Sequence, residues 1–458
     1  MVYQAETKDA TGPLKIHPDN PRYFIDGSGK VVYLTGSHTW GNLQDYGETN
    51  PPPVFDYTGY LDFMQQHNHN FMRMWMWESP HAKDKAGSVD NYYTQPMHYE
   101  RTGPGKANDG GPKFDITKFN QQYFDRLRSR VIAAGERGIY VSVMLFEGWS
   151  VKNFIPGRQV FIYHPYYPDN NINGINGDPN NSGEGLETHS LKLPAITLLQ
   201  EAYVRKVIDT VNDLDNVLYE ISNESALPRT KDWQYYMINY IKQYEAGKPK
   251  QHPVGMTGHS GPIDQYLFDS PADWISPGTP DYHNRNNKEI TNPLATDGRK
   301  VIIQDTDHLG AMYLEDDAAF SRAWVWKTFT RGYNPILMEM HQTNPMGDWR
   351  AGFVAARKAM GQTLAYASKM NLVAMTPRND LASTQYCLAN PGREYLIYQP
   401  EKGECRVILE KGTYSVEWFN PSTGNLLKNS TISVQAGACT FKAPFAGDAV
   451  LYLAICSE

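Results

Sequence analysis

Short runs of apolar residues alternate with helical patterns over most of the chain. Between the runs, stretches such as 117–138 and 196–216 carry apolar residues at the spacing of one helix face. Regular strand–helix alternation predicts a parallel sheet, and eight repeats predict a closed (β/α)₈ barrel, a TIM barrel. The apolar runs cover residues 31–36, 70–78, 139–149, 216–224, 252–259, 273–278, 300–308 and 334–341.

An open doubly wound sheet is the alternative to the barrel. It lacks support, because no G-x-G-x-x-G sequence follows any of the runs. The predicted barrel is longer than usual, and the extra length lies in the loops after the second and third runs. Those loops belong to the side of a barrel on which active sites are built. The longest of them, about 150–193, is rich in Gly, Pro, Asn and Tyr.

From about residue 380 the pattern changes to short strands separated by Gly, Pro and Asn turns, which predicts a small C-terminal antiparallel β-sandwich. We therefore divide the chain into a hairpin segment (1–24), a barrel domain (25–372) and the sandwich (378–458). The hairpin either closes the bottom of the barrel or pairs with the sandwich, and the pattern leaves both open.

Composition excludes several classes of partner. The 458 residues have a formal net charge of -7 and no basic stripe, so we expect no nucleic-acid partner. No apolar run reaches the ~18 residues of a membrane span, so we expect no membrane insertion. The first residues, MVYQAETKDATGP, lack the apolar core of a signal peptide. Oligomeric state stays open.

The four cysteines, Cys387, Cys405, Cys439 and Cys456, lack zinc-ligand spacing. Free buried thiols are favoured over disulfides. The 30 tyrosines and 10 tryptophans are the other unusual feature. Many fall in segments that look like loops, where flat rings suit the apolar faces of sugars; the alternative is that they only line the rim of a cleft.

The sequence LYEISNES places two glutamates inside an apolar run. Alternate side chains of a barrel strand point inward, so Glu220, Ser222 and Glu224 share one face. Glu224 then lies at the C-terminal mouth, where barrel enzymes carry their catalytic residues. Glu220 lies deeper and needs a buried partner. The alternative is that Glu224 only caps the following helix.

The string YEISNE resembles the fourth-strand motif of clan A glycoside hydrolases, above all the cellulase-like family with its YEI-x-NE-P signature. The resemblance implies that Glu224 is the general acid/base and that Asn223 binds the sugar 2-hydroxyl. Ser225 stands where proline is usual, a departure that we do not expect to change the chemistry. The clan also carries a Glu at the end of the seventh strand. Alignment by strand end puts Asp305 there as the nucleophile, with Asp307 as the alternate.

Other positions agree with this resemblance. Arg73, in NFMRMWMW, resembles the second-strand arginine that orients the nucleophile and would keep it ionised; a surface ion pair is the alternative. Further residues at strand ends are expected to bind substrate or to line the site, although a structural role is as plausible for each histidine. They are His38, Trp40, Glu147, Trp149, His259, Tyr282 and Glu339.

The segments GSHTWGNLQD, DTDHLG and WVWKTFTRGYNPILM, together with the C-terminal strands, resemble a wider set of barrel proteins. That set carries a C-terminal domain named for collagen binding and is related to apiosidase-type hydrolases. The domain's name rests on weak similarity, so we do not infer collagen binding from it.

These patterns together indicate a glycoside hydrolase that cleaves plant or microbial polysaccharide or oligosaccharide with two carboxylates and no cofactor. A retaining mechanism is favoured and an inverting one stays open. For such a function we expect a secreted or periplasmic protein. The alternative function is a non-catalytic carbohydrate- or matrix-binding protein on a barrel scaffold. A metal bound by DTDH is a minor alternative. The sugar, the linkage and exo or endo action stay open.

Overall fold

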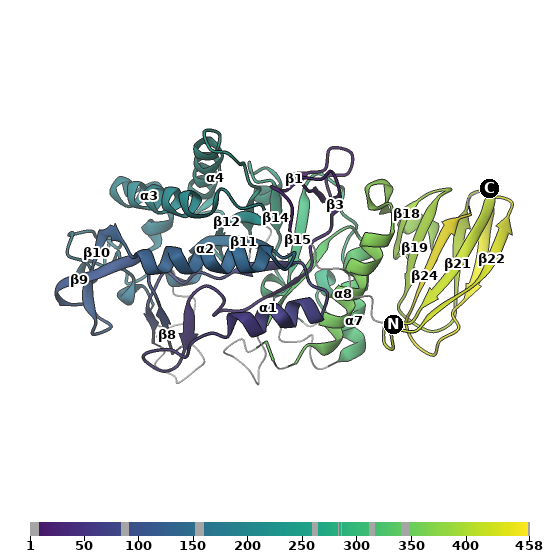
Figure 1. Ribbon diagram of the computed structural model, residues 1–458, viewed down its shortest axis with the longest axis horizontal. Coiled ribbons are helices and arrows are strands. Elements are labelled where there is room, and N and C mark those ends of the chain that lie inside the picture. Colours follow the sequence, from purple (N-terminus) through teal and green to yellow (C-terminus); the bar gives the residue numbers. More distant parts are fainter. Residues whose placement is uncertain are drawn as a thin grey trace.

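A computed structural model of the protein shows a closed barrel of eight parallel strands beside a C-terminal block of antiparallel sheets (Figure 1). The structure describes residues 9–83, 91–151, 160–258, 264–282, 284, 286–310, 317–339, 349–350 and 352–456. The barrel strands are β4 (Gly36–His38), β6 (Phe71–Met74), β11 (Tyr140–Glu147), β12 (Val217–Asn223), β13 (Val254–Thr257), β14 (Trp274–Ser276), β15 (Val301–Asp305) and β16 (Asn334–Met338).

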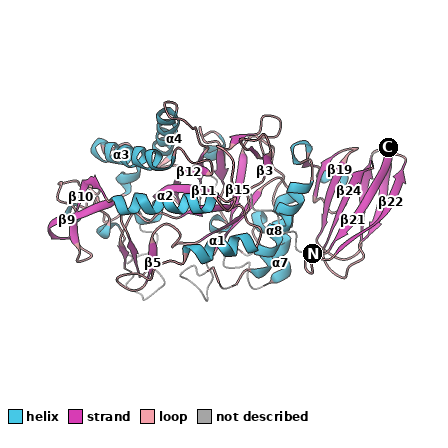
Figure 2. Cartoon of the chain, in the orientation of Figure 1, coloured by secondary structure: helices cyan, strands magenta, loops and turns pink. Residues whose placement is uncertain are grey.

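A helix follows each barrel strand along the chain, which confirms the predicted (β/α)₈ fold and excludes the open sheet (Figure 2). The longer helices pack against the outside of the barrel through their apolar faces. They are α1 (Tyr57–Gln66), α2 (Gln121–Gly135), α3 (Pro194–Val211), α4 (Lys231–Glu245), α5 (Asp264–Phe268), α6 (Lys288–Thr291), α7 (Ala318–Thr330) and α8 (Val354–Lys369).

Two predicted boundaries differ from the structure. The first apolar run does not form the first barrel strand, because Val31–Val32 (β3) belongs to a separate small sheet and β4 begins only at Gly36. A side chain at Gly36 would collide with the carbonyl oxygen of Phe71, so glycine permits the close approach of β4 and β6. The helix predicted from residue 117 begins at Gln121, after the Asn120 side chain accepts a hydrogen bond from the Gln122 N–H (3.2 Å).

The small sheet of β1 (Lys15–Ile16), β2 (Phe24–Ile25) and β3 closes the bottom of the barrel. Its apolar side chains pack on the residues that fill the barrel interior at the N-terminal ends of the strands. Trp274 fills much of this space, and Gly255 on the neighbouring strand leaves room for its ring. The plug consists of Leu14, Phe24, Val32, Leu34, Phe71, Tyr140, Leu218, Trp274, Val301, Ile303 and Ile336.

The extra length predicted after the second strand forms strands, not only loops, and these belong to two further sheets, one of which also takes in β5 from the connection after β4. The strands β5 (Asp45–Gly47), β7 (His81–Ala82) and β8 (Tyr92–Gln95) pair antiparallel, with β8 in the middle. The strands β9 (Tyr99–Lys106) and β10 (Pro112–Phe119) form a hairpin at the end of the molecule opposite the C-terminal sheets (Figure 1). Between residues 160 and 193, the segment after β11 contains short 3₁₀ turns and an isolated β-bridge from Asn171 to Phe114 of β10.

The C-terminal region is built from two antiparallel sheets that enclose a core of their own. The opposite face of the larger sheet packs through Leu396, Tyr398 and Phe419 on Trp326 and Tyr366 of α7 and α8. The larger sheet contains β17 (Thr376–Pro377), β18 (Cys387–Asn390), β19 (Glu394–Gln399), β24 (Ala449–Ile455), β21 (Gly412–Phe419) and β22 (Leu426–Val434), and the smaller one β20 (Glu404–Leu409) and β23 (Gly437–Lys442).

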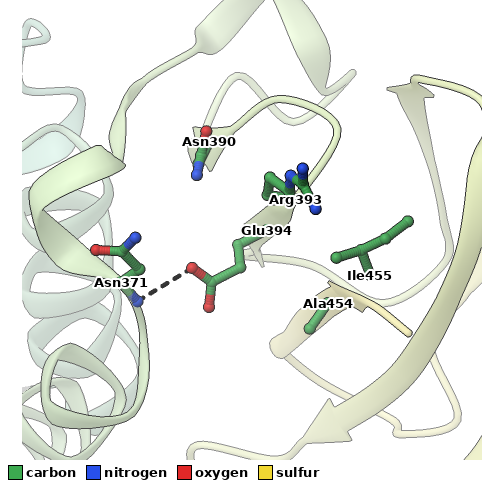
Figure 3. Close-up of a pocket in the computed structure, with 6 residues that line it drawn as sticks. All are labelled: Asn371, Asn390, Arg393, Glu394, Ala454 and Ile455. Carbon is green, nitrogen blue, oxygen red and sulfur yellow. Dashed lines mark hydrogen bonds between the residues drawn. The ribbon is translucent and has the colours of Figure 1, made fainter. Parts of the chain in front are cut away.

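Polar contacts add to this apolar junction between barrel and sheets. The Asn371 N–H, just after α8, donates to the Glu394 carboxylate of β19 (3.0 Å) beside a hollow that Asn390 and Arg393 also line (Figure 3).

The four cysteines are free thiols. Among the described helices, none is long and apolar enough to span a membrane.

Candidate active site

Above the apolar plug, the barrel interior turns polar around one buried arginine. Arg73 points inward from β6 and is fully buried. Its Nε donates to Glu220 Oε2 (2.8 Å) and its Nη2 to Glu220 Oε1 (2.5 Å), a bidentate pair across the barrel. Arg73 is therefore the buried partner that Glu220 needs.

The rest of the Arg73 guanidinium faces the mouth of the barrel. Nη1 donates to Asp305 Oδ2 (2.6 Å) and, at 3.4 Å, to Asp307 Oδ2. Nη2 also donates to Asn223 Oδ1 (2.8 Å). Burial lowers the pKa of Arg73, but the charges of Glu220 and Asp305 outweigh burial and raise it above its ordinary value. The arginine is a permanent positive charge.

Asp305, the last residue of β15, has hydrogen-bond partners at both carboxylate oxygens. Besides Arg73, it contacts His38 Nε2 at 2.9 to 3.0 Å, and its Oδ1 accepts the Asp307 N–H (2.9 Å). Burial raises the pKa of Asp305, but His38 and Arg73 together take it well below its ordinary value. Burial also lowers the pKa of His38. Asp305 is thus an ionised carboxylate with no exposed surface.

Asp307 lies one step nearer the opening, with 5% of its side chain exposed. Burial, then the charges of Glu224 and Asp305, raise the pKa of Asp307 well above its ordinary value. His308 lies beside it, with Nε2 3.7 Å from Asp307 Oδ2. The same ring is positioned by the Ser276 hydroxyl at Nδ1 (3.0 Å).

Glu224 follows β12 at the mouth and is half-buried. Its φ of 50° lies in the left-handed region, which is uncommon for a residue with a side chain and is concentrated at functional sites. A Cβ on Gly148 would lie 2.6 Å from Ser225 N and 2.7 Å from the Glu224 carbonyl carbon. Only glycine at 148 therefore lets the end of β11 approach the Glu224 turn this closely.

A third carboxyl group, Glu147 at the end of β11, is fully buried beside this turn. It accepts hydrogen bonds from Trp149 N (2.7 Å), Ser150 N (2.8 Å) and Ser150 Oγ (2.9 Å). Burial and the charge of Glu224 nevertheless raise the pKa of Glu147 to about 8. Glu147, Glu224 and Asp307 therefore form a group of carboxyls at the mouth that repel one another when ionised.

Aromatic rings form one side of the mouth. The chain continues past β6 in an extended form, because the side chains of Asn42 and Gln44 accept the N–H groups of Trp75 (2.6 Å) and Trp77 (2.7 Å). The half-buried Trp40 packs edge-on against Trp77 (5.8 Å, 84°). Trp149 and the tyrosines of β5 and β8 complete a cluster of Trp40, Tyr46, Trp75, Trp77, Tyr92 and Trp149.

The structure thus brings together Glu224, Asp305, Asp307, Asn223, Arg73, His38, Trp40, Glu147 and Trp149 at one end of the barrel. Tyr282 is half-buried in the turn after β14. The Glu339 carboxylate accepts a hydrogen bond from Arg357 Nε of α8 (3.1 Å), a helix on the outside of the barrel. His259 lies outside the described residues. Within the described part of the chain, no three His, Cys, Asp or Glu residues form a metal-binding group.

Sequence reasoning missed six residues of this region: Trp75, Trp77, Glu78, His164, His189 and His308. Trp75, Trp77 and Glu78 continue the second apolar run, and a charge at its end was a usable signal. His164 and His189 lie in the irregular segment after β11, whose contacts follow no periodicity. His308 was noted only as part of DTDH.

Comparisons with known proteins agree with this fold. Residues 82–272 match a protein family described as a domain of unknown function, DUF6298. No curated protein matches at a significant level.

Two of the solved structures that match are a family 5 glycoside hydrolase from Bacteroides vulgatus and a structure described as a glycoside hydrolase. The first has 12% identity and a TM-score of 0.63, and the match covers 98% of this chain and 95% of that one. The second has 12% identity and a TM-score of 0.65, and the match covers 98% and 99%. At this identity the likeness shows a shared fold, and it extends through the C-terminal sheets.

Replacing Asp305 or Asp307 by asparagine should change the free energy of unfolding in different ways. Asp305→Asn removes an ionised partner of buried Arg73 and should lower the free energy of unfolding at pH 7 by about 3–5 kcal/mol. Asp307 has a raised pKa, so its ionisation costs stability as pH rises. Asp307→Asn should therefore leave stability unchanged or raise it by on the order of 1 kcal/mol. Urea denaturation at pH 7 measures both, and equal losses would contradict this assignment.

Glu147 should make stability depend on pH. A carboxyl whose pKa rises on folding stabilises the folded state below its unfolded pKa of about 4.3, and this is lost as pH rises towards 8. Glu147→Gln should be less stable than the native protein at pH 5, because an amide cannot accept hydrogen bonds on both sides. The difference should shrink by up to about 4 kcal/mol by pH 8, at 1.36 kcal/mol per unit. A difference that does not vary with pH would contradict the expectation.

Proposed function

We propose that the protein is a retaining glycoside hydrolase, with Glu224 as general acid/base and an aspartate after β15 as nucleophile. The observation that carries the proposal is the arrangement at the barrel mouth. A half-exposed carboxyl on a strained turn lies electrostatically coupled to a second carboxyl, which is in turn in contact with a buried arginine. Two carboxyls with different environments are what acid-assisted displacement at a sugar carbon requires.

Glu224 is suited to the proton-transfer role because it is the more accessible of the mouth carboxyls. Asn223 supports it. Its Oδ1 accepts from Arg73 and from His308 Nε2 (3.2 Å), so the amide nitrogen is directed away from those donors and can donate to a sugar hydroxyl. The resemblance assigns the same role to this asparagine.

For the nucleophile, we propose Asp307 in place of the strand-end alignment's choice, Asp305. Both oxygens of Asp305 are occupied by Arg73, His38 and a backbone N–H, and its side chain has no surface that a substrate could touch. The Asp307 side chain keeps 5% of its surface whereas that of Asp305 keeps none, and Glu224 lies close enough for its charge to raise the pKa of Asp307 after burial does. In the proposed mechanism Glu224 donates the proton to the leaving group and Asp307 attacks as the carboxylate. Arg73 favours the ionised form of Asp307.

The two half-buried indoles of the aromatic cluster, Trp40 and Trp149, support a carbohydrate as the substrate, because indole rings pack well on the apolar faces of sugars. A non-catalytic carbohydrate-binding role is the other candidate, and the intact set of Glu224, Asp307 and Arg73 argues against it. Extracellular glycans as substrates would require an exported precursor.

Replacing Glu224 should slow turnover by an amount that depends on the leaving group of the substrate. Glu224→Ala should lose about 100- to 10,000-fold of turnover on glycosides with poor leaving groups, which need a proton. Activated aryl glycosides should lose much less, and added azide should restore turnover and yield a β-glycosyl azide if the substrate is a β-glycoside. Assays on a panel of aryl glycosides and polysaccharides measure this. The exposed Glu136→Ala, beyond the end of α2, is the control. Unchanged turnover in Glu224→Ala would refute the role.

A mechanism-based fluoro-sugar should identify the nucleophile by forming a stable glycosyl ester. We expect the label on the peptide containing Asp307, and Asp307→Asn should lose about a thousand-fold or more in kcat. Peptide mass mapping of the labelled protein reads the position. Label on Asp305 would return the role to the strand-end residue. An inverted product anomer with no label would contradict the retaining mechanism itself.

A further inference from the structure

A chain of buried hydrogen bonds leads from the second strand to the residue after Glu224. It begins at Glu78, which follows β6 in the extended segment and is 2% exposed. Glu78 Oε1 accepts from His189 Nε2 (2.9 Å) and from Glu147 N (2.7 Å). Its Oε2 accepts from His164 Nε2 (3.1 Å). Both histidines belong to the irregular segment after β11, so Glu78 anchors that segment to the barrel mouth.

The other face of His189 continues the chain. Its Nδ1 lies 3.0 Å from Ser225 Oγ, and Ser225 Oγ lies 2.6 Å from Ser222 Oγ. The His189 ring stacks on Trp233 at 4.4 Å with an angle of 7° between the planes, which fixes its orientation. His189 and Ser222 have no exposed surface and Ser225 is 4% exposed.

The charge on Glu78 fixes the direction of the hydrogen bonds that this carboxylate makes. Burial raises the pKa of Glu78, but His189 and His164 lower it far below its ordinary value, so the carboxylate only accepts. His189 Nε2 then carries a proton, and its Nδ1 shares a hydrogen bond with the Ser225 hydroxyl. Ser225 Oγ and Ser222 Oγ share the next one, so every group in this series of hydrogen bonds has a partner.

This order of acid, histidine and serine is that of a hydrolase triad, but a nucleophilic serine does not fit the surroundings. The Ser225 oxygen is buried and lies between His189 and Ser222. The series of hydrogen bonds instead restrains Ser225, and with it the backbone of the turn at Glu224. Glu224 is in the left-handed region, and such a conformation persists only where neighbouring structure holds it. Gly148 packs on this turn from one side and His189 restrains it from the other.

We propose that Ser225, His189 and Glu78 are positioning residues that hold the strained Glu224 turn in the geometry for proton donation. This inference rests on the proposed role of Glu224 as acid/base. Ser225 stands where the clan motif carries proline, and its hydroxyl takes over the restraint of the turn. The segment after β11 thereby takes part in acid catalysis, although its histidines do not touch the substrate.

Leaving-group dependence tests this role, because a positioning defect should affect only the step that needs a proton. Ser225→Ala and His189→Phe should lose about ten- to a hundred-fold in kcat on aryl glycosides with poor leaving groups. They should change less than about three-fold on activated ones. The rate of labelling by a fluoro-sugar with a good leaving group should stay near that of the native protein. Glu78→Gln tests the same chain from its far end, with little change of shape.

The control is a second buried Glu–His pair at the opposite end of the barrel. His252 Nδ1 lies 2.8 Å from Glu245 Oε1, and the pair is as buried as the first. His252→Phe should destabilise the protein as His189→Phe does, yet leave the leaving-group dependence unchanged.

Each outcome decides the proposal. An equal loss of turnover across all leaving groups in Ser225→Ala and Glu78→Gln would overturn it in favour of a purely structural role, as would turnover equal to that of the native protein. If Glu224→Ala shows the expected dependence and these variants do not, the positioning role alone fails. If the native protein cleaves no glycoside in the panel, the proposed function fails.

Discussion

The charge of Arg73, buried in the middle of the barrel, is the constraint on which the site depends. An unpaired guanidinium in this place would cost several kcal/mol, so the surrounding strands must supply acceptors. Glu220 takes two of its N–H groups and Asp305 a third at 2.6 Å. Only a long contact of 3.4 Å is left for Asp307. One positive charge thus faces three carboxyls from two strands.

This imbalance explains the electrostatics of the mouth. Glu220 and Asp305 take the strong bonds to Arg73, and His38 adds to the stabilisation of Asp305. Asp307 receives little of that stabilisation, and burial, followed by the charges of Glu224 and Asp305, raises its pKa. Glu147 at the end of β11 also has a raised pKa, because it is fully buried and lies near the charge of Glu224. Burial and neighbouring negative charge thus favour the protonated form of the carboxyls that Arg73 stabilises least.

The mouth itself is built by side chains that replace regular backbone pairing. Asn42 and Gln44 accept hydrogen bonds from the backbone past β6 and so fix Trp75 and Trp77, which are almost fully buried beneath the half-buried Trp40 and Trp149 in one cluster. Glu78, at the end of that extension, binds the segment after β11 through two histidines. The segments beyond the barrel strands are thus attached to the barrel through hydrogen bonds of polar side chains. The C-terminal sheets bury the outer face of α7 and α8 and belong to the same folded unit.

The sequence by itself determined the eight strand–helix units and the antiparallel C-terminal sheets, because each is a local periodicity of apolar residues. It also determined that Glu220 and Glu224 face inward at different depths, since a strand alternates its faces. Tertiary structure alone decided what no local pattern encodes. The short strands β5, β7 and β8 contain too few alternating residues to be distinguished from loops. The contacts of His164 and His189 with Glu78 span 86 and 111 residues. The choice between Asp305 and Asp307 depends on where the chain leaves β15 and which carboxylate then meets Arg73, and that is set by packing across the barrel.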